Sequence, residues 1–178
     1  VGWSTIDYPA FRQIITRTIG DNKLLLTIFQ GNQTNSQNGQ YKEYELEDLA
    51  KLFSRPKKGP KHIGYFVRGK LDPLHRKDVN LASADLMVLD GDRTSKDEQS
   101  CCPPMDVHIA LKEMNINHVI YTTHSHSFNK NKFRVLIPCK IGSKENLKAT
   151  VNHILTELLA KDVDIYNVKE MNTWSQPW

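Results

Sequence analysis

The sequence contains no apolar run that could cross a membrane and no signal-peptide pattern at its start. A membrane-spanning helix needs roughly 20 consecutive, mostly apolar residues, and a secretory signal needs a basic start followed by an apolar stretch. Because neither pattern is present, we expect a cytoplasmic protein that has no membrane partner.

Cysteine is scarce and poorly placed for structural chemistry. The three cysteines, Cys101, Cys102 and Cys139, cannot all pair with one another, and none has the C-x-x-C spacing of a zinc site. We interpret them as reduced thiols without a chemical role, as is usual in a reducing cytoplasm.

Charge of one sign is not strongly in excess. The chain has 24 Lys and Arg, 20 Asp and Glu and a net charge of +4, but its basic residues are unevenly distributed. One cluster lies in a stretch broken by Pro and Gly and consists of Arg55, Lys57, Lys58 and Lys61. Such a cluster attracts phosphate backbones through counterion release, which favours a nucleic-acid partner. A solvated loop without a partner is the alternative that charge alone leaves open.

The hydrophobic spacing predicts alternating helices and strands. We expect helices over 8–17, 45–53, 104–114 and 144–159, and strands over 63–67, 86–89, 119–122, 133–137 and 163–165. Ser143 is suited to cap the longest helix, because its hydroxyl can accept from a backbone N–H of the first turn. This order, which includes a hairpin, predicts an α+β fold whose sheet packs one face on helices.

The most informative pattern is Asp90-Gly91-Asp92, which follows a buried apolar run. Residues two apart in a strand point to the same side, with Cα atoms roughly 6.5 Å apart. Paired carboxylates repel each other unless a cation binds them, so the pattern indicates a site for divalent metal ions. A plain turn is the alternative. A calcium loop is excluded, because its Gly and Glu positions are Ser95 and Cys101 here.

A hairpin expected after the strand over 119–122 carries His124 and His126, followed by Lys130, Lys132 and Arg134. Histidines at alternate positions can bind a metal or donate to a phosphate, and the neighbouring cations favour phosphate. A polar loop without function is the alternative reading.

A third carboxylate would complete a two-metal site: Asp164, between apolar residues, is the better candidate, and Asp162 stays open. An acid in an exposed turn is the alternative for either one.

Together these motifs resemble the archaeo-eukaryotic primase superfamily. The matching residues are Leu89-Asp90-Gly91-Asp92, Thr122-Thr123-His124 and Val163-Asp164. The chain is most similar to the primase-polymerase domains of phages, plasmids and integrated mobile elements, through the stretches Tyr121-Thr122-Thr123-His124-Ser125-His126 and Phe133-Arg134-Val135-Leu136-Ile137-Pro138. The likeness extends from about residue 76 to residue 164.

The resemblance implies an RRM-like catalytic core with a mainly antiparallel sheet flanked by helices, and a smaller N-terminal α/β lobe. We accordingly expect one domain over 1–178, with the first lobe over about 1–80 and the metal-bearing lobe over about 81–178. The chain begins at Val1 and ends at Trp178 in an aromatic stretch, which we interpret as a piece of a longer polypeptide.

The resemblance also implies DNA primase or DNA polymerase activity, by nucleotidyl transfer with Mg²⁺ or Mn²⁺. Asp90, Asp92 and Asp164 would hold the metals, and His124 would act with them in catalysis. The residues expected to hold the incoming nucleoside triphosphate are His124, His126, Arg134, Arg76 and Lys132. The expected partners are a single-stranded DNA template with its primer, nucleoside triphosphates, and a helicase domain or protein downstream of this chain. The expected location is the cytoplasm of a bacterial or archaeal host.

Two other functions fit parts of the pattern. A metal-dependent nicking enzyme or nuclease could use His124 and His126, with Tyr166 as nucleophile. A non-catalytic single-strand-binding module would leave Asp90 and Asp92 in a turn. Such a module stacks bases on aromatic side chains of one sheet face, but Tyr65 and Phe66 are adjacent and therefore point to opposite faces.

Overall fold

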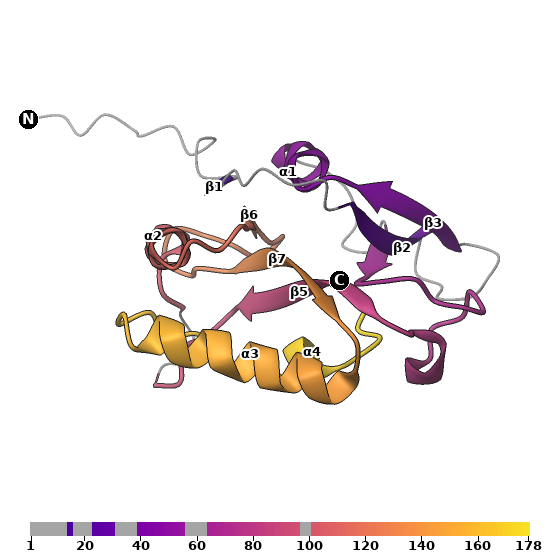
Figure 1. Cartoon of the computed structure of the whole chain (residues 1–178). Coiled ribbons are helices and arrows are strands. Elements are labelled where there is room, and N and C mark those ends of the chain that lie inside the picture. Colours follow the sequence, from indigo (N-terminus) through magenta and orange to yellow (C-terminus); the bar gives the residue numbers. More distant parts are fainter. Residues whose placement is uncertain (1–13, 16–22, 31–38, 56–63, 97–100) are drawn as a thin grey trace, which may run out of the picture.

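The computed structural model describes residues 14–15, 23–30, 39–55, 64–96 and 101–178, which form two antiparallel sheets flanked by helices. This confirms the predicted α+β class. Figure 1 shows the long helix α3 along one side of the larger sheet, with α1 and the smaller sheet on the other side.

The larger sheet has the strand order β1-β6-β7-β5. Its strands are β1 (Ile14–Ile15), β6 (Val119–Thr122), β7 (Phe133–Ile141) and β5 (Ala84–Gly91). β5 and β6 each run antiparallel to β7, which lies between them. β5 is buried along almost its whole length, as expected for its continuous apolar sequence.

The smaller sheet has the order β3-β2-β4, with β2 (Leu24–Gln30) between β3 (Gly39–Tyr44) and β4 (Gly64–Val67). Helix α1 (Leu46–Ser54) follows β3 directly. The last residue, Trp178, adds to this sheet, because its backbone N–H and C=O both bond to Phe66 at 2.9 Å. In Figure 1 the C-terminal end accordingly lies in the middle of the molecule, beside β5.

Helices α2 (Pro104–Glu113) and α3 (Lys144–Leu159) cover one face of the larger sheet. The Ser143 hydroxyl accepts from the Asn146 N–H at 3.2 Å, so the predicted cap of α3 is confirmed. A single turn of helix, α4 (Lys169–Asn172), follows and packs against α3 and β5. A short 3-10 helix, η2 (Asp78–Asn80), precedes β5.

Alternate residues of β5 enter two different cores. Met87 and Leu89 pack with α2 and α3, whereas Leu86 and Val88 pack with residues of β2, β4 and α1. The larger sheet is therefore covered on both faces. Its second face is the one on which Asp90 lies, since Asp90 continues the series of Leu86 and Val88.

Hydrogen bonds join the smaller sheet to the chain that enters β5. The Thr27 hydroxyl donates to the Gly69 carbonyl at 2.7 Å and accepts from the Leu71 N–H at 3.0 Å. The Asp85 carboxylate accepts from the Leu25 N–H at 2.9 Å, and the Asp85 N–H donates to the Arg68 carbonyl at 2.8 Å. These bonds fix the start of β5 against the smaller sheet.

Two of the predicted secondary-structure elements are wrong. The helix expected over 8–17 is contradicted at Ile14–Ile15, which form a strand paired with Val119 and Ile120; the rest of that range lies outside the described residues. Adjacent β-branched residues suit an edge strand better than a helix. The strand expected over 163–165 is an irregular segment, although Val163 and Ile165 are buried as predicted. The other predicted helices and strands are confirmed within a few residues.

Among the described residues, none of the helices combines the length and apolar character that crossing a bilayer requires.

Replacing Thr27 with Val tests the link between the two sheets. The change keeps the shape of the side chain but leaves the Gly69 carbonyl and the Leu71 N–H without their buried partner. We expect the free energy of unfolding to fall by about 2–4 kcal/mol, measured by urea denaturation. The matched control is Thr156→Val on the exposed side of α3, where the hydroxyl donates to the Asn152 carbonyl; it should change stability by less than about 0.5 kcal/mol. Equal losses would contradict the proposed link.

Candidate functional site

The acidic pair lies at the end of β5. Asp90 and Asp92 flank Gly91, whose missing side chain is explained by Phe133 on the neighbouring strand. A Cβ atom at position 91 would lie 2.3 Å from the Phe133 ring, which is fully buried in the core. The opposite side of residue 91 is thus filled, so the two carboxylates are left on the other side of the strand.

Two basic side chains face this acidic pair from β7 and the residue before it. Asp90 lies directly opposite Arg134 in the antiparallel register, and Gly91 opposite Phe133. The Arg134 Nε lies 3.6 Å from the Asp90 Oδ1, and the Lys132 Nζ forms an ion pair with the Asp92 Oδ1. Two acids at the end of β5 therefore meet two bases at the start of β7.

The surroundings of Asp90 shift its pKa upward. Burial raises the pKa of Asp90, Arg134 opposes this, and the negative charges of Asp92 and Glu170 add to the rise. The carboxylate form of Asp90 is therefore disfavoured, and an additional positive charge would stabilise it. Sequence reasoning missed Glu170, because a lone acid on the short helix α4 has no motif around it.

Arg134 is held by aromatic residues as well as by Asp90. Its guanidinium carbon lies 5.0 Å from the centroid of the Trp178 ring. Tyr121, on the neighbouring strand β6, lies directly opposite Arg134. Burial tends to lower the pKa of Arg134, but Tyr121 and Asp90 outweigh it and raise the pKa. The guanidinium is therefore firmly charged and oriented. The sequence position of Trp178 did not predict its contact with Arg134.

Asp164 lies near the chain that leaves β5 but does not join the acidic pair. Its Oδ2 accepts from the Ser95 N–H at 3.1 Å and from the Ser95 hydroxyl at 2.5 Å. Asp162, the open alternative, is exposed in the turn after α3 with a φ of 61°. Within the described ranges, His, Cys, Asp and Glu side chains nowhere gather in a group of three that could hold a metal ion.

The two histidines of the hairpin between β6 and β7 differ in burial and in hydrogen bonding. The His126 Nδ1 accepts from the Lys132 N–H at 3.1 Å, which leaves its proton on Nε2. Burial lowers the pKa of His126, so the ring is neutral at pH 7. His124 is exposed in the turn. The structure thus fixes His126 beside Lys132 and leaves His124 at the surface.

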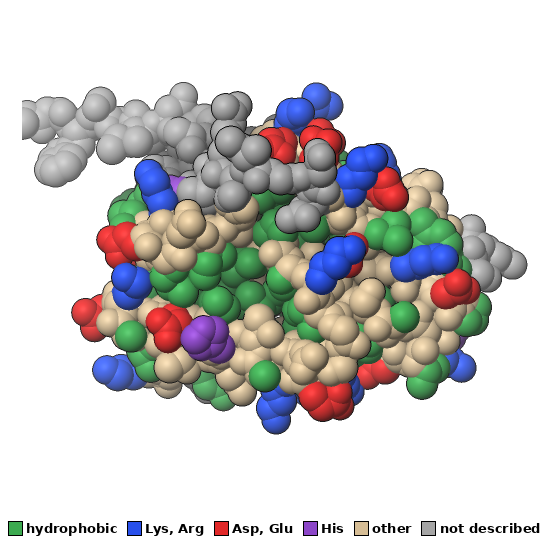
Figure 2. Space-filling view, in the orientation of Figure 1, with side chains coloured by type: hydrophobic (Ala, Val, Ile, Leu, Met, Phe, Trp, Pro, Cys, Tyr) green, Lys and Arg blue, Asp and Glu red, His purple; other side chains and the backbone are tan. Residues whose placement is uncertain are grey.

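Of the remaining predicted residues, the structure describes Arg76 and Arg55. Arg76 donates through Nε to the Ser175 carbonyl at 2.9 Å and so secures the C-terminal segment. Arg55 is exposed at the end of α1. The other members of its basic cluster, Lys57, Lys58 and Lys61, lie outside the described residues. Figure 2 shows charged side chains of both signs interspersed over the described part of the visible face.

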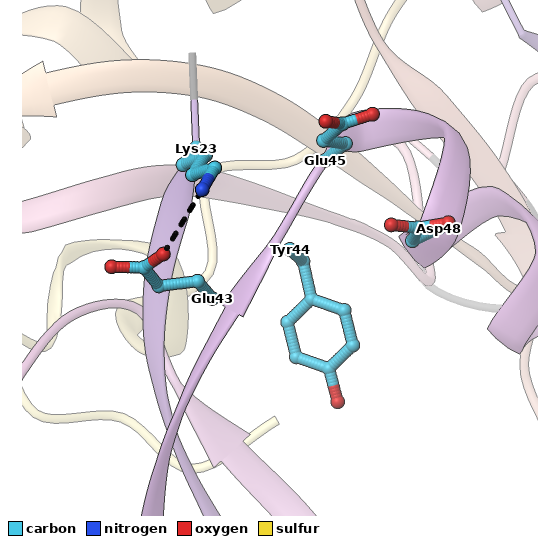
Figure 3. Close-up of a pocket in the computed structure, with 5 residues that line it drawn as sticks. All are labelled: Lys23, Glu43, Tyr44, Glu45 and Asp48. Atoms are coloured by element: carbon cyan, nitrogen blue, oxygen red, sulfur yellow. Dashed lines mark ion pairs between the residues drawn. The ribbon is translucent and has the colours of Figure 1, made fainter. Parts of the chain in front are cut away.

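A cavity of about 210 Å³ lies at the smaller sheet and the start of α1, lined by Lys23, Glu43, Tyr44, Glu45 and Asp48. Figure 3 shows Lys23 paired with Glu43, and Glu45 and Asp48 at the beginning of the helix. Three carboxylates against one ammonium group would repel a triphosphate. This cavity is therefore unsuited to a nucleotide, unlike the charged groups at the end of β5.

The side chains at the end of β5 fit a divalent cation in their chemistry. Carboxylate oxygens are the ligands that Mg²⁺ and Mn²⁺ prefer. The raised pKa of Asp90 and the ion pair of Lys132 with Asp92 both indicate negative charge that a cation would neutralise. Asp90 and Asp92 could hold such an ion together, whereas the Asp164 carboxylate is bonded through Oδ2 to Ser95.

Fold and site define an α+β protein of two antiparallel sheets with an acidic and a basic pair at one strand end. The VapE N-terminal domain family matches residues 18–174, and the chain belongs to this family. Membership suggests a replication-associated protein of a phage or another mobile element. Comparisons with curated proteins and with solved structures gave no significant match.

Replacing Asp90 with Asn tests whether the charge of Asp90 destabilises the folded protein. Because the pKa of Asp90 is raised in the folded protein, its charge destabilises the fold at neutral pH and not below the ordinary pKa of aspartate. In EDTA at pH 7 we expect Asp90→Asn to increase the free energy of unfolding, and we expect the gain to vanish near pH 3. Urea denaturation across this pH range measures it. The control Asp162→Asn, at an exposed position, should give no such gain. A loss of stability for Asp90→Asn at pH 7 would show that the Asp90 charge does not destabilise the fold.

Proposed function

We propose that this chain is the catalytic core of a template-dependent nucleotidyl transferase, a DNA primase or polymerase that replicates a mobile element. The observation that carries the proposal is the end of β5, where Asp90 and Asp92 face Arg134 and Lys132 across the strand pair. Nucleotidyl transfer needs carboxylates for divalent cations and fixed positive charge for the triphosphate, and both occur here on one sheet face.

Asp90 and Asp92 would hold Mg²⁺ or Mn²⁺, with Asp164 as the proposed third ligand. A divalent ion there supplies charge neutralisation for the attacking 3′-hydroxyl and the departing pyrophosphate. Lys132 now contacts Asp92. We infer that Lys132 turns from Asp92 to a phosphate oxygen when the nucleotide arrives, because Lys132 is the more mobile partner on its long side chain.

Arg134 and His126 would bind the triphosphate in the orientation that the reaction requires. Arg134 stays charged and is held between Asp90, Tyr121 and Trp178, so it can stabilise negative charge as the transition state forms. His126 keeps its proton on Nε2, because Nδ1 is occupied by the Lys132 N–H. The Nε2–H can therefore donate a hydrogen bond to a phosphate oxygen without change of protonation.

The template would lie on the basic cluster that includes Arg55 at the end of α1. Lysine and arginine contacts to phosphates bind any sequence and weaken as salt is added. Such contacts suit an enzyme that copies whatever strand it is given.

Incorporation of labelled nucleotides on a primed template with Mn²⁺ tests the proposal. We expect Asp90→Ala and Asp92→Ala each to reduce incorporation at least about 100-fold, because each removes a metal ligand. Asp164→Ala should also impair it, whereas Asp162→Asn, which suits the positive φ of that residue, should not.

No incorporation by the unaltered chain, or equal rates for Asp92→Ala and Asp162→Asn, would contradict nucleotidyl transfer. A covalent adduct with single-stranded DNA that is lost in Tyr166→Phe would instead support nicking.

His126→Gln and His124→Gln distinguish the two histidines. Because His126 is fixed against the Lys132 backbone and His124 is exposed, we expect His126→Gln to raise the KM for the nucleoside triphosphate about tenfold. His124→Gln should raise it far less. Steady-state kinetics on a saturating primed template measure both, and a larger effect at His124 would reverse the assignment.

A further inference from the structure

The tip of the β6–β7 hairpin presents an aromatic side chain to solvent. Phe128 is 78% exposed. Phe128 and Asn129 form a two-residue turn, since the Ser127 and Lys130 backbones bond to each other at 3.0 and 3.1 Å. Gly, Asn and Asp are the usual residues of such turns.

The hairpin that carries Phe128 is well braced. The Thr123 N–H donates to the Lys132 carbonyl at 2.9 Å, and the His126 N–H donates to the Thr123 carbonyl at 3.0 Å. The Asn131 side chain donates to the Cys101 carbonyl at 3.0 Å and ties the hairpin to the segment before α2. Because β7 begins at Phe133, which lies opposite Gly91, the hairpin extends from the same end of the sheet as the acidic pair.

The surroundings of Phe128 match the chemistry of a single nucleic-acid strand. Residues 121–132 contain two histidines and two lysines but no acidic residue. His124 and Lys130 are exposed, and the immediate neighbours Ser127 and Asn129 are polar. An aromatic anchor for a protein partner is usually surrounded by other contacts that exclude water. An aromatic ring on a hairpin that also carries two lysines and no acid instead suits a base that stacks while its phosphates are neutralised.

We propose that Phe128 stacks on an unpaired base of the strand that the enzyme copies, with Lys130 and His124 beside the adjoining phosphates. The role of that strand as a template rests on the proposed function, whereas binding of the strand does not. Phe128 is thereby a positioning residue that sets the strand against Asp90 and Asp92.

Fluorescence anisotropy with a labelled oligothymidine of about 15 nucleotides tests the proposal without any reaction. Loss of one base–aromatic stack should weaken binding by Phe128→Ala at least about fivefold. Phe128→Trp should bind as well as the unaltered chain. The control Val79→Ala removes another highly exposed apolar side chain, on η2 and 88% exposed, and should have no effect. Lys130→Ala should weaken binding and reduce its dependence on salt.

Two further probes separate the alternatives. Binding of a blunt duplex should be insensitive to Phe128→Ala, because its bases are already stacked. The KM for the nucleoside triphosphate should also be unaffected; a raised KM with unaltered oligonucleotide binding would place the free nucleotide on the ring and overturn the proposal. Undetectable binding of oligothymidine by the unaltered chain, or equal binding by Phe128→Ala, would overturn it too. Phe128-dependent binding without nucleotide incorporation would refute only the proposed function.

Discussion

The antiparallel pairing of β5 with β7 is the constraint on which the site depends. Its register places Asp90 opposite Arg134 and Gly91 opposite Phe133, and the residues beyond bring Lys132 to Asp92. A slip of one residue would turn every side chain to the other face. Such a slip would bury both acids against α2 and α3. The acids therefore meet the bases only when the strands pair in the correct register.

This arrangement places repelling and attracting charges at the end of a strand that is otherwise apolar. The hydrophobic residues of β5 enter cores on both sides, and they hold Asp90 where burial raises its pKa. The cost of that placement is local and is offset by Arg134 and by the surrounding core. An exposed loop could carry the same acids at lower cost, but it would not fix them against Arg134.

Local pattern was enough to predict the class of fold and most elements. The buried run before Asp90, the apolar stripe of α3 and its Ser143 cap are all determined by nearby residues. The contacts that complete the site come from distant parts of the chain, as with Trp178 against Arg134 and Glu170 near Asp90, and no spacing rule indicates them. The same limit applies to Ile14–Ile15, whose strand exists only because β6 offers an edge, and to Asp164, whose bond to Ser95 no motif encodes.

The close approach of Gly91 to Phe133 also restricts how this family can diversify. Any side chain at position 91 would enter the space of a ring buried in the core. A larger residue at 91 therefore requires a smaller one at 133, and the two positions should change together among relatives. Since position 91 separates the acids and position 133 separates the bases, this one packing contact lies at the centre of both charged pairs.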